Sequence, residues 1–219
     1  MLSKRLEEIY KMIPEVSSVL DVGTDHCFLP IEIRKNNPDI KIGASDVAKG
    51  PLKFAKESLM KNGISDITLY LSDGLKNIDE QYECIIIAGM GAMNIINILE
   101  GNQTYTSNSE CLLLQSNKDT DKLREWLSHN NFEITDESFV YEYKHYQIIL
   151  ARHGTSSYSD EDIMFGPYLR FEKSNVFLEF WESECKKLEM ISKKLDSRNS
   201  NKANIDKKIS MIRDLLRKQ

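Results

Sequence analysis

An apolar run that ends in Asp21-Val-Gly23 constrains the fold of this chain more than any other feature. Such a run is typical of a buried strand that leads into a tight turn, and a glycine there lets the backbone approach a ligand closely. Asp46 follows Gly23 by 23 residues and ends a second expected strand, and Asp73 ends a third. This is about the spacing at which the second strand of a βαβ unit presents a carboxylate to the ribose of a nucleoside cofactor.

The turn after Gly23 indicates which cofactor is bound. A dinucleotide site requires Gly-x-Gly-x-x-Gly, so that backbone N–H groups can hold a pyrophosphate. This turn has one glycine and places Asp25 where a phosphate would lie. S-adenosylmethionine carries a sulfonium and an ammonium and no phosphate, so nearby carboxylates attract it. The sequence therefore favours S-adenosylmethionine over NAD; the alternative is that Asp25 only caps a helix that begins at His26.

Apolar runs and amphipathic segments alternate along the first 151 residues. After a helix over residues 3–12, the expected strands are 18–23, 40–46, 67–72, 83–89 and 110–115, and the expected helices are 26–36, 50–62, 91–100 and 119–130. This alternation predicts an α/β fold with a parallel sheet wound on both faces and ligands at the carboxyl ends of its strands. Residues 132–142 and 144–151 predict a terminal antiparallel hairpin, which completes a Rossmann-like methyltransferase domain.

The composition changes after His153. A polar connector is expected over residues 154–160. Beyond it, apolar residues keep a spacing near 3.5 from Phe177 to Leu195, and spacings of four, three and four from Ile205 to Leu216. The polar segment 197–201 separates these two stripes and predicts a helix break. The sequence therefore predicts a cofactor-binding domain over residues 1–153 and an antiparallel helical coiled-coil domain over residues 154–219.

Charged residues are distributed unevenly along the chain. Residues 181–219 hold 11 Lys or Arg and 6 Asp or Glu, a net charge of +5, whereas the first 180 residues hold 18 and 28, a net charge of −10. A basic helical segment beside an acidic domain fits a polyanionic partner such as RNA. The alternative is a solvated, lysine-rich helix surface.

Other bulk features exclude several classes of protein. The four cysteines lie far apart in the sequence and indicate neither a zinc site nor a disulfide framework. No apolar run approaches the roughly 20 residues of a membrane span, and the first residues lack the apolar core of a signal peptide. A cytoplasmic protein with no metal and no membrane contact is expected.

Residues 85–92 end a buried strand in a glycine-containing turn, where an acceptor would enter. Enzymes of this fold that methylate amines usually carry Asp/Asn-Pro-Pro-aromatic at this turn, and this chain does not. Met90 could instead pack on a flat base, and the amides of Gln115 and Asn117 could contact a base edge. The alternatives are core packing for Met90 and turn formation for the two amides.

Taken together, these segments resemble the bacterial tRNA (adenine-22, N1)-methyltransferases, which join a methyltransferase domain to a C-terminal helical coiled coil. The motifs that carry the resemblance are Ser3–Leu6, Asp21–His26 with Leu29–Pro30, Asp46–Pro51, Asp73–Leu75, Ala88–Gly91 and Phe165–Pro167. The chain departs from the family pattern at Ala92, where a glycine is usual, and at Ser116, where a proline is usual.

The resemblance implies a cytoplasmic enzyme, expected to be a monomer, that transfers a methyl group from S-adenosylmethionine to adenine N1 in tRNA. The residues expected to hold the cofactor are Arg5, Asp21, Gly23, Asp25, Asp46, Val47, Asp73, Gly74, Ala88 and Gly89, and those expected at the acceptor are Asp25, His26, Met90, Gln115 and Asn117.

Three of these residues have specific expected roles. Asp25 would offset the positive charge that develops on the base, and His26 would orient Asp25 or contact the exocyclic amine. Arg5 would bind the methionine carboxylate if the N-terminal helix covers the pocket. The alternatives are a structural hydrogen bond for His26 and an ordinary surface position for Arg5.

Two other functions fit the same sequence. One is a methyltransferase that acts on ribosomal RNA, protein or a small molecule, which only a substrate assay separates from a tRNA enzyme. The other is a binding module that keeps the cofactor fold without turnover and holds a partner through its helical tail. Cofactor binding without methyl transfer to any RNA would favour the second.

Overall fold

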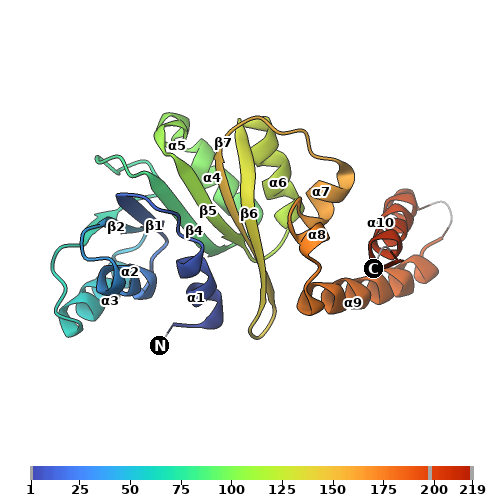
Figure 1. The fold of residues 1–219 in the computed structure, drawn as a ribbon, viewed down its shortest axis with the longest axis horizontal. Coiled ribbons are helices and arrows are strands. Elements are labelled where there is room, and N and C mark those ends of the chain that lie inside the picture. Colours follow the sequence, from blue (N-terminus) through green and yellow to red (C-terminus); the bar gives the residue numbers. More distant parts are fainter. Residues whose placement is uncertain (1, 197–198, 218–219) are drawn as a thin grey trace. The chain divides into compact units, whose positions relative to one another are not determined.

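The computed structural model describes residues 2–196 and 199–217, and the chain divides into two compact units, one up to Tyr158 and one from Ser159 onward (Figure 1). The boundary lies after Tyr158 rather than at His153. Tyr158 belongs to the first unit because it packs against that unit's core and its hydroxyl accepts a hydrogen bond from the Ile134 N–H at 2.7 Å.

The first unit contains one sheet whose strand order is β3-β2-β1-β4-β5-β7-β6. The strands are β1 (Ser18–Val22), β2 (Lys41–Asp46), β3 (Thr68–Leu71), β4 (Cys84–Met90), β5 (Cys111–Ser116), β6 (Phe132–Tyr141) and β7 (His145–His153). The first five are parallel, and β7 pairs antiparallel with both β5 and β6. The expected parallel sheet and terminal hairpin are confirmed. The strand order reverses between β1 and β4, which is where open α/β sheets bind ligands.

Helices cover both faces of this sheet. Within residues 2–158 the helices are α1 (Lys4–Lys11), α2 (Phe28–Asn36), α3 (Lys49–Lys61), α4 (Ala92–Glu100), α5 (Gln103–Asn108) and α6 (Thr120–His129). Because strand side chains alternate between faces, Leu20 and Val22 pack with α4, α5 and α6, while Val19 packs with α1, α2 and α3.

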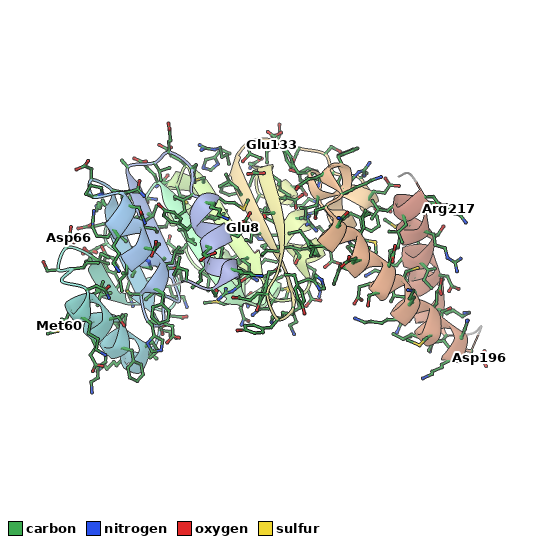
Figure 2. All side chains as sticks on the ribbon, turned by 60° about the horizontal axis from the view of Figure 1, so that its bottom comes forward. Glu8, Met60, Asp66, Glu133, Asp196 and Arg217 are labelled. Atoms are coloured by element: carbon green, nitrogen blue, oxygen red, sulfur yellow. The ribbon has the colours of Figure 1, made fainter. Side chains whose placement is uncertain are left out.

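Helix α1 is fastened to β6. Glu8 of α1, labelled in Figure 2, accepts a hydrogen bond from the Ser138 hydroxyl at 2.7 Å, and the Lys4 N–H donates to Glu142 at 2.8 Å. Ser3 caps the helix, since its hydroxyl accepts from the Leu6 N–H. These contacts bring the N-terminal segment to the carboxyl edge of the sheet, where the β6–β7 turn also lies (Figure 1).

In the part of the second unit that the structure describes, all regular elements are helices. It contains α7 (Asp160–Phe165), α8 (Leu169–Glu172), α9 (Asn175–Lys194) and α10 (Ser200–Arg217). Glu189 pairs with Arg213 at 2.7 Å, and Ser192 donates to Asp206 at 2.5 Å. Contacts in this order require α9 and α10 to run antiparallel, as expected; a coiled coil in the strict sense stays a prediction.

Three details of the sequence prediction were wrong. The helices α5, α7 and α8 were missed, and α7 begins within the segment expected to be a connector. The helix break is also displaced, because α9 ends at Lys194 and α10 already begins at Ser200. Residues 197 and 198 of the predicted break lie outside the described residues.

Candidate active site

A cavity of about 410 Å³ lies at the carboxyl edge of the sheet, beside the point where the strand order reverses. The ends of β1, β2, β3 and β4 form one side, and α4 forms the other. The lining residues are Val22, Gly23, Asp46, Val47, Ser72, Asp73, Gly74, Lys76, Met90, Asn94, Asn97, Ile98 and Gly101. Six of the residues singled out in the sequence therefore share one cavity: Gly23, Asp46, Val47, Asp73, Gly74 and Met90.

Gly23 and Met90 form the wall nearest to β1. Gly23 has φ +78° and its N–H donates to the Ser45 carbonyl at 2.8 Å, which ties the end of β1 to β2. A Cβ atom added at Gly23 would overlap with the Met90 methyl carbon. Met90 is partly buried and packs against the core of the α4 face, so its core-packing interpretation is confirmed, and contact with a base stays a prediction.

Replacing Gly23 with alanine is expected to destabilise the fold more than the same change at Gly63. Both glycines have positive φ, which costs an alanine roughly 1–2 kcal/mol, but nothing lies within 4 Å of a Cβ added at Gly63. The extra decrease in the free energy of unfolding at Gly23 should disappear when Met90 is also alanine. Urea denaturation measures Gly23→Ala, Gly63→Ala, Met90→Ala and the double variant Gly23→Ala with Met90→Ala. Equal decreases in the free energy of unfolding at the two glycines would contradict this packing.

The carboxylates at the ends of β2 and β3 differ in their surroundings. Asp46 is half-buried, and its Oδ1 accepts a hydrogen bond from the Ala48 N–H at 3.0 Å, which orients the side chain beside the cavity. Asp73 lies two residues beyond the end of β3 and is exposed, with an ion pair to Lys76 at 2.5 Å. The buried Ser72 donates to the Gly74 carbonyl at 2.8 Å and so holds this turn.

Asp21 is buried at the end of β1. The pKa of its carboxyl group is raised from 3.8 to about 6, chiefly by burial; the Thr24 hydrogen bond and the Arg5 charge lower it, and the nearby Asp46 adds to the rise. Asp21 is not among the cavity-lining residues. It directly precedes Val22 and Gly23, which do line the cavity.

A second cluster joins the ends of β4 and β5. Arg5 donates to the Gln115 Oε1 at 2.7 Å, and the Gly89 N–H donates to the same oxygen at 3.0 Å. Asn117 donates from its side chain to the Gly89 carbonyl at 2.6 Å and from its backbone to the Met90 carbonyl at 2.7 Å. These hydrogen bonds fix the end of β4 and the residue that leads into α4, together residues 88–91 (the β4 turn). They also show that Arg5 is not an ordinary surface arginine.

The expected contact between Gln115 and a base edge is not what the structure shows. Gln115 is fully buried, and its oxygen is occupied by two donors of this chain. Asn117 is exposed but also bonded to the β4 turn. Ala88 and Gly89 lie near the end of β4 and do not line the 410 Å³ cavity. Both amides therefore position the turn from which an acceptor would be approached.

Asp25 and His26 lie on the exposed turn after β1. Asp25 has φ +50°, and its Oδ1 lies 3.7 Å from the His26 Nε2. The capping interpretation of Asp25 is wrong, because α2 begins at Phe28 after Cys27 and has no side-chain cap. The His26 ring stacks with Phe28 and Phe54, so the structure places it beside Asp25 but holds it by aromatic contact.

Sequence reasoning missed the contribution of α4 to the cavity. Asn94, Asn97 and Gly101 line it from successive turns. The signal was present, since two asparagines three residues apart in an otherwise apolar helix mark one polar stripe. Across residues 2–196 and 199–217 no group of three or more His, Cys, Asp or Glu side chains could hold a metal ion, and no helix is long and apolar enough to cross a membrane.

Comparison with known proteins places this geometry in a family. Residues 19–214 match the family of tRNA (adenine(22)-N(1))-methyltransferases. The tRNA (adenine(22)-N(1))-methyltransferase of Bacillus subtilis is 31% identical over 215 residues, covering 94% of this chain and 90% of the relative.

Two solved structures are similar over almost the whole chain. A Streptococcus pneumoniae protein in complex with S-adenosyl-L-methionine has a TM-score of 0.90 and 35% identity, covering 99% of this chain and 100% of the other. M. capricolum TrmK in complex with S-adenosyl-homocysteine has a TM-score of 0.89 and 29% identity, with coverage of 99% and 98%. With the family match over residues 19–214, these findings establish that the chain belongs to the tRNA (adenine(22)-N(1))-methyltransferases.

Proposed function

We propose that the 410 Å³ cavity binds the adenosine part of S-adenosyl-L-methionine and that the β4 turn receives the target adenine. The chain is an S-adenosyl-L-methionine-dependent enzyme that methylates N1 of adenine 22 in tRNA. The observation that carries the proposed site is the position of Asp46, held by Ala48 at the end of β2 beside the cavity. A cytoplasmic, monomeric enzyme is part of the proposal.

Different residues contact the adenosine part and the methionine part of the cofactor. Asp46 accepts hydrogen bonds from the ribose hydroxyls, while Asp73 and Gly74 contact the adenine ring beside Val47. Asp21 attracts the methionine ammonium, and Arg5 binds the methionine carboxylate from α1. The hydrogen bond from Arg5 to Gln115 supports this role, because it holds the guanidinium next to the β4 turn.

The reaction requires no base before the methyl group moves. Adenine N1 has an in-plane lone pair, which forms the bond to the methyl carbon as the carbon–sulfur bond breaks and its electron pair stays on sulfur. Positive charge thus passes from the sulfonium to the base. Aligning nitrogen, carbon and sulfur with water excluded supplies about 7–11 kcal/mol of the barrier reduction. Asp25 stabilises the charge that develops on the base.

Reaching N1 requires a change in the RNA. N1 lies on the pairing edge of adenine inside a stem, so the nucleotide must leave the stack at a cost of a few kcal/mol. Transfer of a labelled methyl group from S-adenosyl-L-methionine to an unmodified tRNA transcript tests the function. Cofactor binding without transfer to this RNA would instead support a non-catalytic binding module.

The affinity for S-adenosyl-L-methionine is expected to fall as the pH drops through about 6. The pKa of Asp21 is raised in the folded protein, so its contribution to folding stability is complete below pH 3.8 and is lost as the pH rises through about 6. The cofactor ammonium favours the ionised form instead. Binding should therefore weaken by up to about tenfold for each pH unit below the raised pKa.

An Asp21→Asn variant separates the effect of this carboxyl group from that of every other titrating group. Its cofactor affinity should be lower than that of the wild type at pH 7.5 and should change little between pH 7 and 5. Isothermal titration calorimetry across this range measures both proteins. Parallel pH profiles in the two proteins would show that Asp21 does not contact the ammonium.

Reversing charge at Lys186, Lys187, Lys193 and Lys194 is expected to weaken tRNA binding. All four are exposed on α9, in the region whose net charge is +5. For every phosphate that these side chains no longer neutralise, the slope of log affinity against log salt should become shallower by about 0.7–0.9. Lysine-to-arginine changes at the same positions are the control, since they keep the charge. Unchanged affinity and slope after reversal would mean that α9 is a solvated surface.

A further inference from the structure

Three aromatic rings stack on the surface where α2 and α3 begin. The His26 ring lies 5.3 Å from that of Phe28 with an interplanar angle of 13°, and 5.2 Å from that of Phe54 with an angle of 25°. Phe28 is 54% exposed and Phe54 is 49% exposed. Stacking against His26 orders both rings while leaving half of each in water. An ordered, exposed aromatic cluster of this kind is typical of a binding surface.

This surface adjoins the cofactor cavity. His26 and Phe28 follow the end of β1 just after Gly23, and Phe54 lies on α3, which follows the end of β2. Val47, between Asp46 and α3, lines the cavity and is 67% exposed. An occupant of the aromatic cluster would therefore lie beside a bound cofactor.

Lysines accompany the aromatic rings. Lys49, Lys53 and Lys56 recur at helical spacing along the exposed side of α3, and within the described ranges none of them forms an ion pair with a carboxylate. The helix contains four lysines and one glutamate, in a region of 180 residues with a net charge of −10. The carboxylates nearest to these lysines in sequence are Asp46 and Glu57. A basic strip on an acidic domain indicates a polyanionic occupant.

We propose that His26, Phe28 and Phe54, with Lys49 and Lys53, form an aromatic–lysine face that binds the tRNA substrate. A nucleobase left unstacked when the target adenine turns out of its stem stacks on the exposed phenyl rings, and the lysines contact the adjoining phosphates. Proteins commonly bind unstacked nucleotides by stacking the bases on aromatic rings and by placing basic side chains along the phosphates. The inference rests on the proposed function, because that function supplies an RNA whose stem must open next to the cavity.

A double variant, Phe28→Leu with Phe54→Leu, tests the stacking. It keeps apolar side chains but removes the flat rings, so tRNA affinity measured with S-adenosyl-homocysteine present should fall by about tenfold or more. Cofactor affinity should stay within about twofold of the wild type. Met60→Ala is the matched control: Met60, labelled in Figure 2, is 71% exposed at the far end of the same helix, and its removal should leave tRNA binding unchanged.

A second double variant, Lys49→Glu with Lys53→Glu, tests the phosphate contacts. It should weaken tRNA binding and make its salt dependence shallower, whereas Lys122→Glu on α6 should do neither. If the wild type methylates adenine 22 and all these variants bind tRNA as it does, the inference is overturned and the proposed function stands. If the wild type neither binds nor methylates tRNA, both are overturned.

Discussion

Replacing Asp46 with alanine is expected to weaken S-adenosyl-L-methionine binding by roughly 1.5–3 kcal/mol, a factor of about 10 to 150. The carboxylate lies beside the cavity at the end of β2, and the Ala48 N–H already orients it, so little reorganisation opposes its hydrogen bonds to the ribose. Removing both charge-assisted hydrogen bonds should appear almost entirely in cofactor affinity. Isothermal titration calorimetry measures this affinity directly.

Two further variants make the Asp46 result interpretable. Asp46→Asn keeps the shape and removes the charge, so its affinity should lie between those of the wild type and the alanine variant. Asp39→Ala removes an exposed aspartate from the opposite end of β2 and should leave affinity unchanged. Wild-type affinity in a folded Asp46→Ala protein would remove Asp46 from the ribose site.

Asp25→Asn is expected to slow methyl transfer by about 10- to 100-fold while cofactor affinity changes by less than about threefold. Asparagine tolerates positive φ as well as aspartate does, so the turn at φ +50° should persist. The variant lacks the negative charge that stabilises the methylated, cationic base. The rate measured in a single turnover, with cofactor and tRNA saturating, isolates this step.

The Asp25 test has a clear contrary outcome. If the single-turnover rate of Asp25→Asn equals that of the wild type, the charge on the base is stabilised by another group or by solvent. An equal decrease in cofactor affinity and in rate would instead place Asp25 in the cofactor site. Thermal unfolding of both proteins is the control for a disturbed turn.

The sheet and the cavity could be predicted because their signals are local. Each of the five parallel strands is a short segment of four to seven residues, and ligand-facing groups stand where the strands end: Gly23 directly follows β1, and Asp46 is the last residue of β2. In a parallel sheet the carboxyl ends of neighbouring strands meet at one edge, so residues distant in sequence are brought together by topology alone. The fold therefore places these groups without any information on side-chain packing.

The cluster at the β4 turn could not be predicted because it depends on contacts between distant segments. Arg5 and Gln115 are 110 residues apart, and their hydrogen bond forms only because α1 is fastened to β6. Gln115 lies at the end of a buried strand, as expected, but burial turns its amide toward the chain rather than toward a base. Sequence pattern alone distinguishes these two orientations poorly.

The three helices that the sequence analysis did not predict were missed for different reasons. Helix α7 carries a capping box, in which the Ser159 hydroxyl and the Asp162 carboxylate each accept from the other's backbone N–H; the serine and aspartate three residues apart were a readable signal. Helix α5 consists mainly of polar residues with no apolar period, and α8 spans only four residues. Tertiary packing of Tyr105 and Leu169 determines these two short helices.

The most direct test of the proposed site and reaction is to map methylated nucleosides in tRNA treated with the purified protein and S-adenosyl-L-methionine. One transcript should carry adenine at position 22, and a second should carry guanine there. Nuclease digestion and mass spectrometry should find 1-methyladenine at position 22 of the first transcript only, and far less of it with the Asp46→Ala protein at limiting cofactor. Methylation at another position, or equal methylation of both transcripts, would contradict the account.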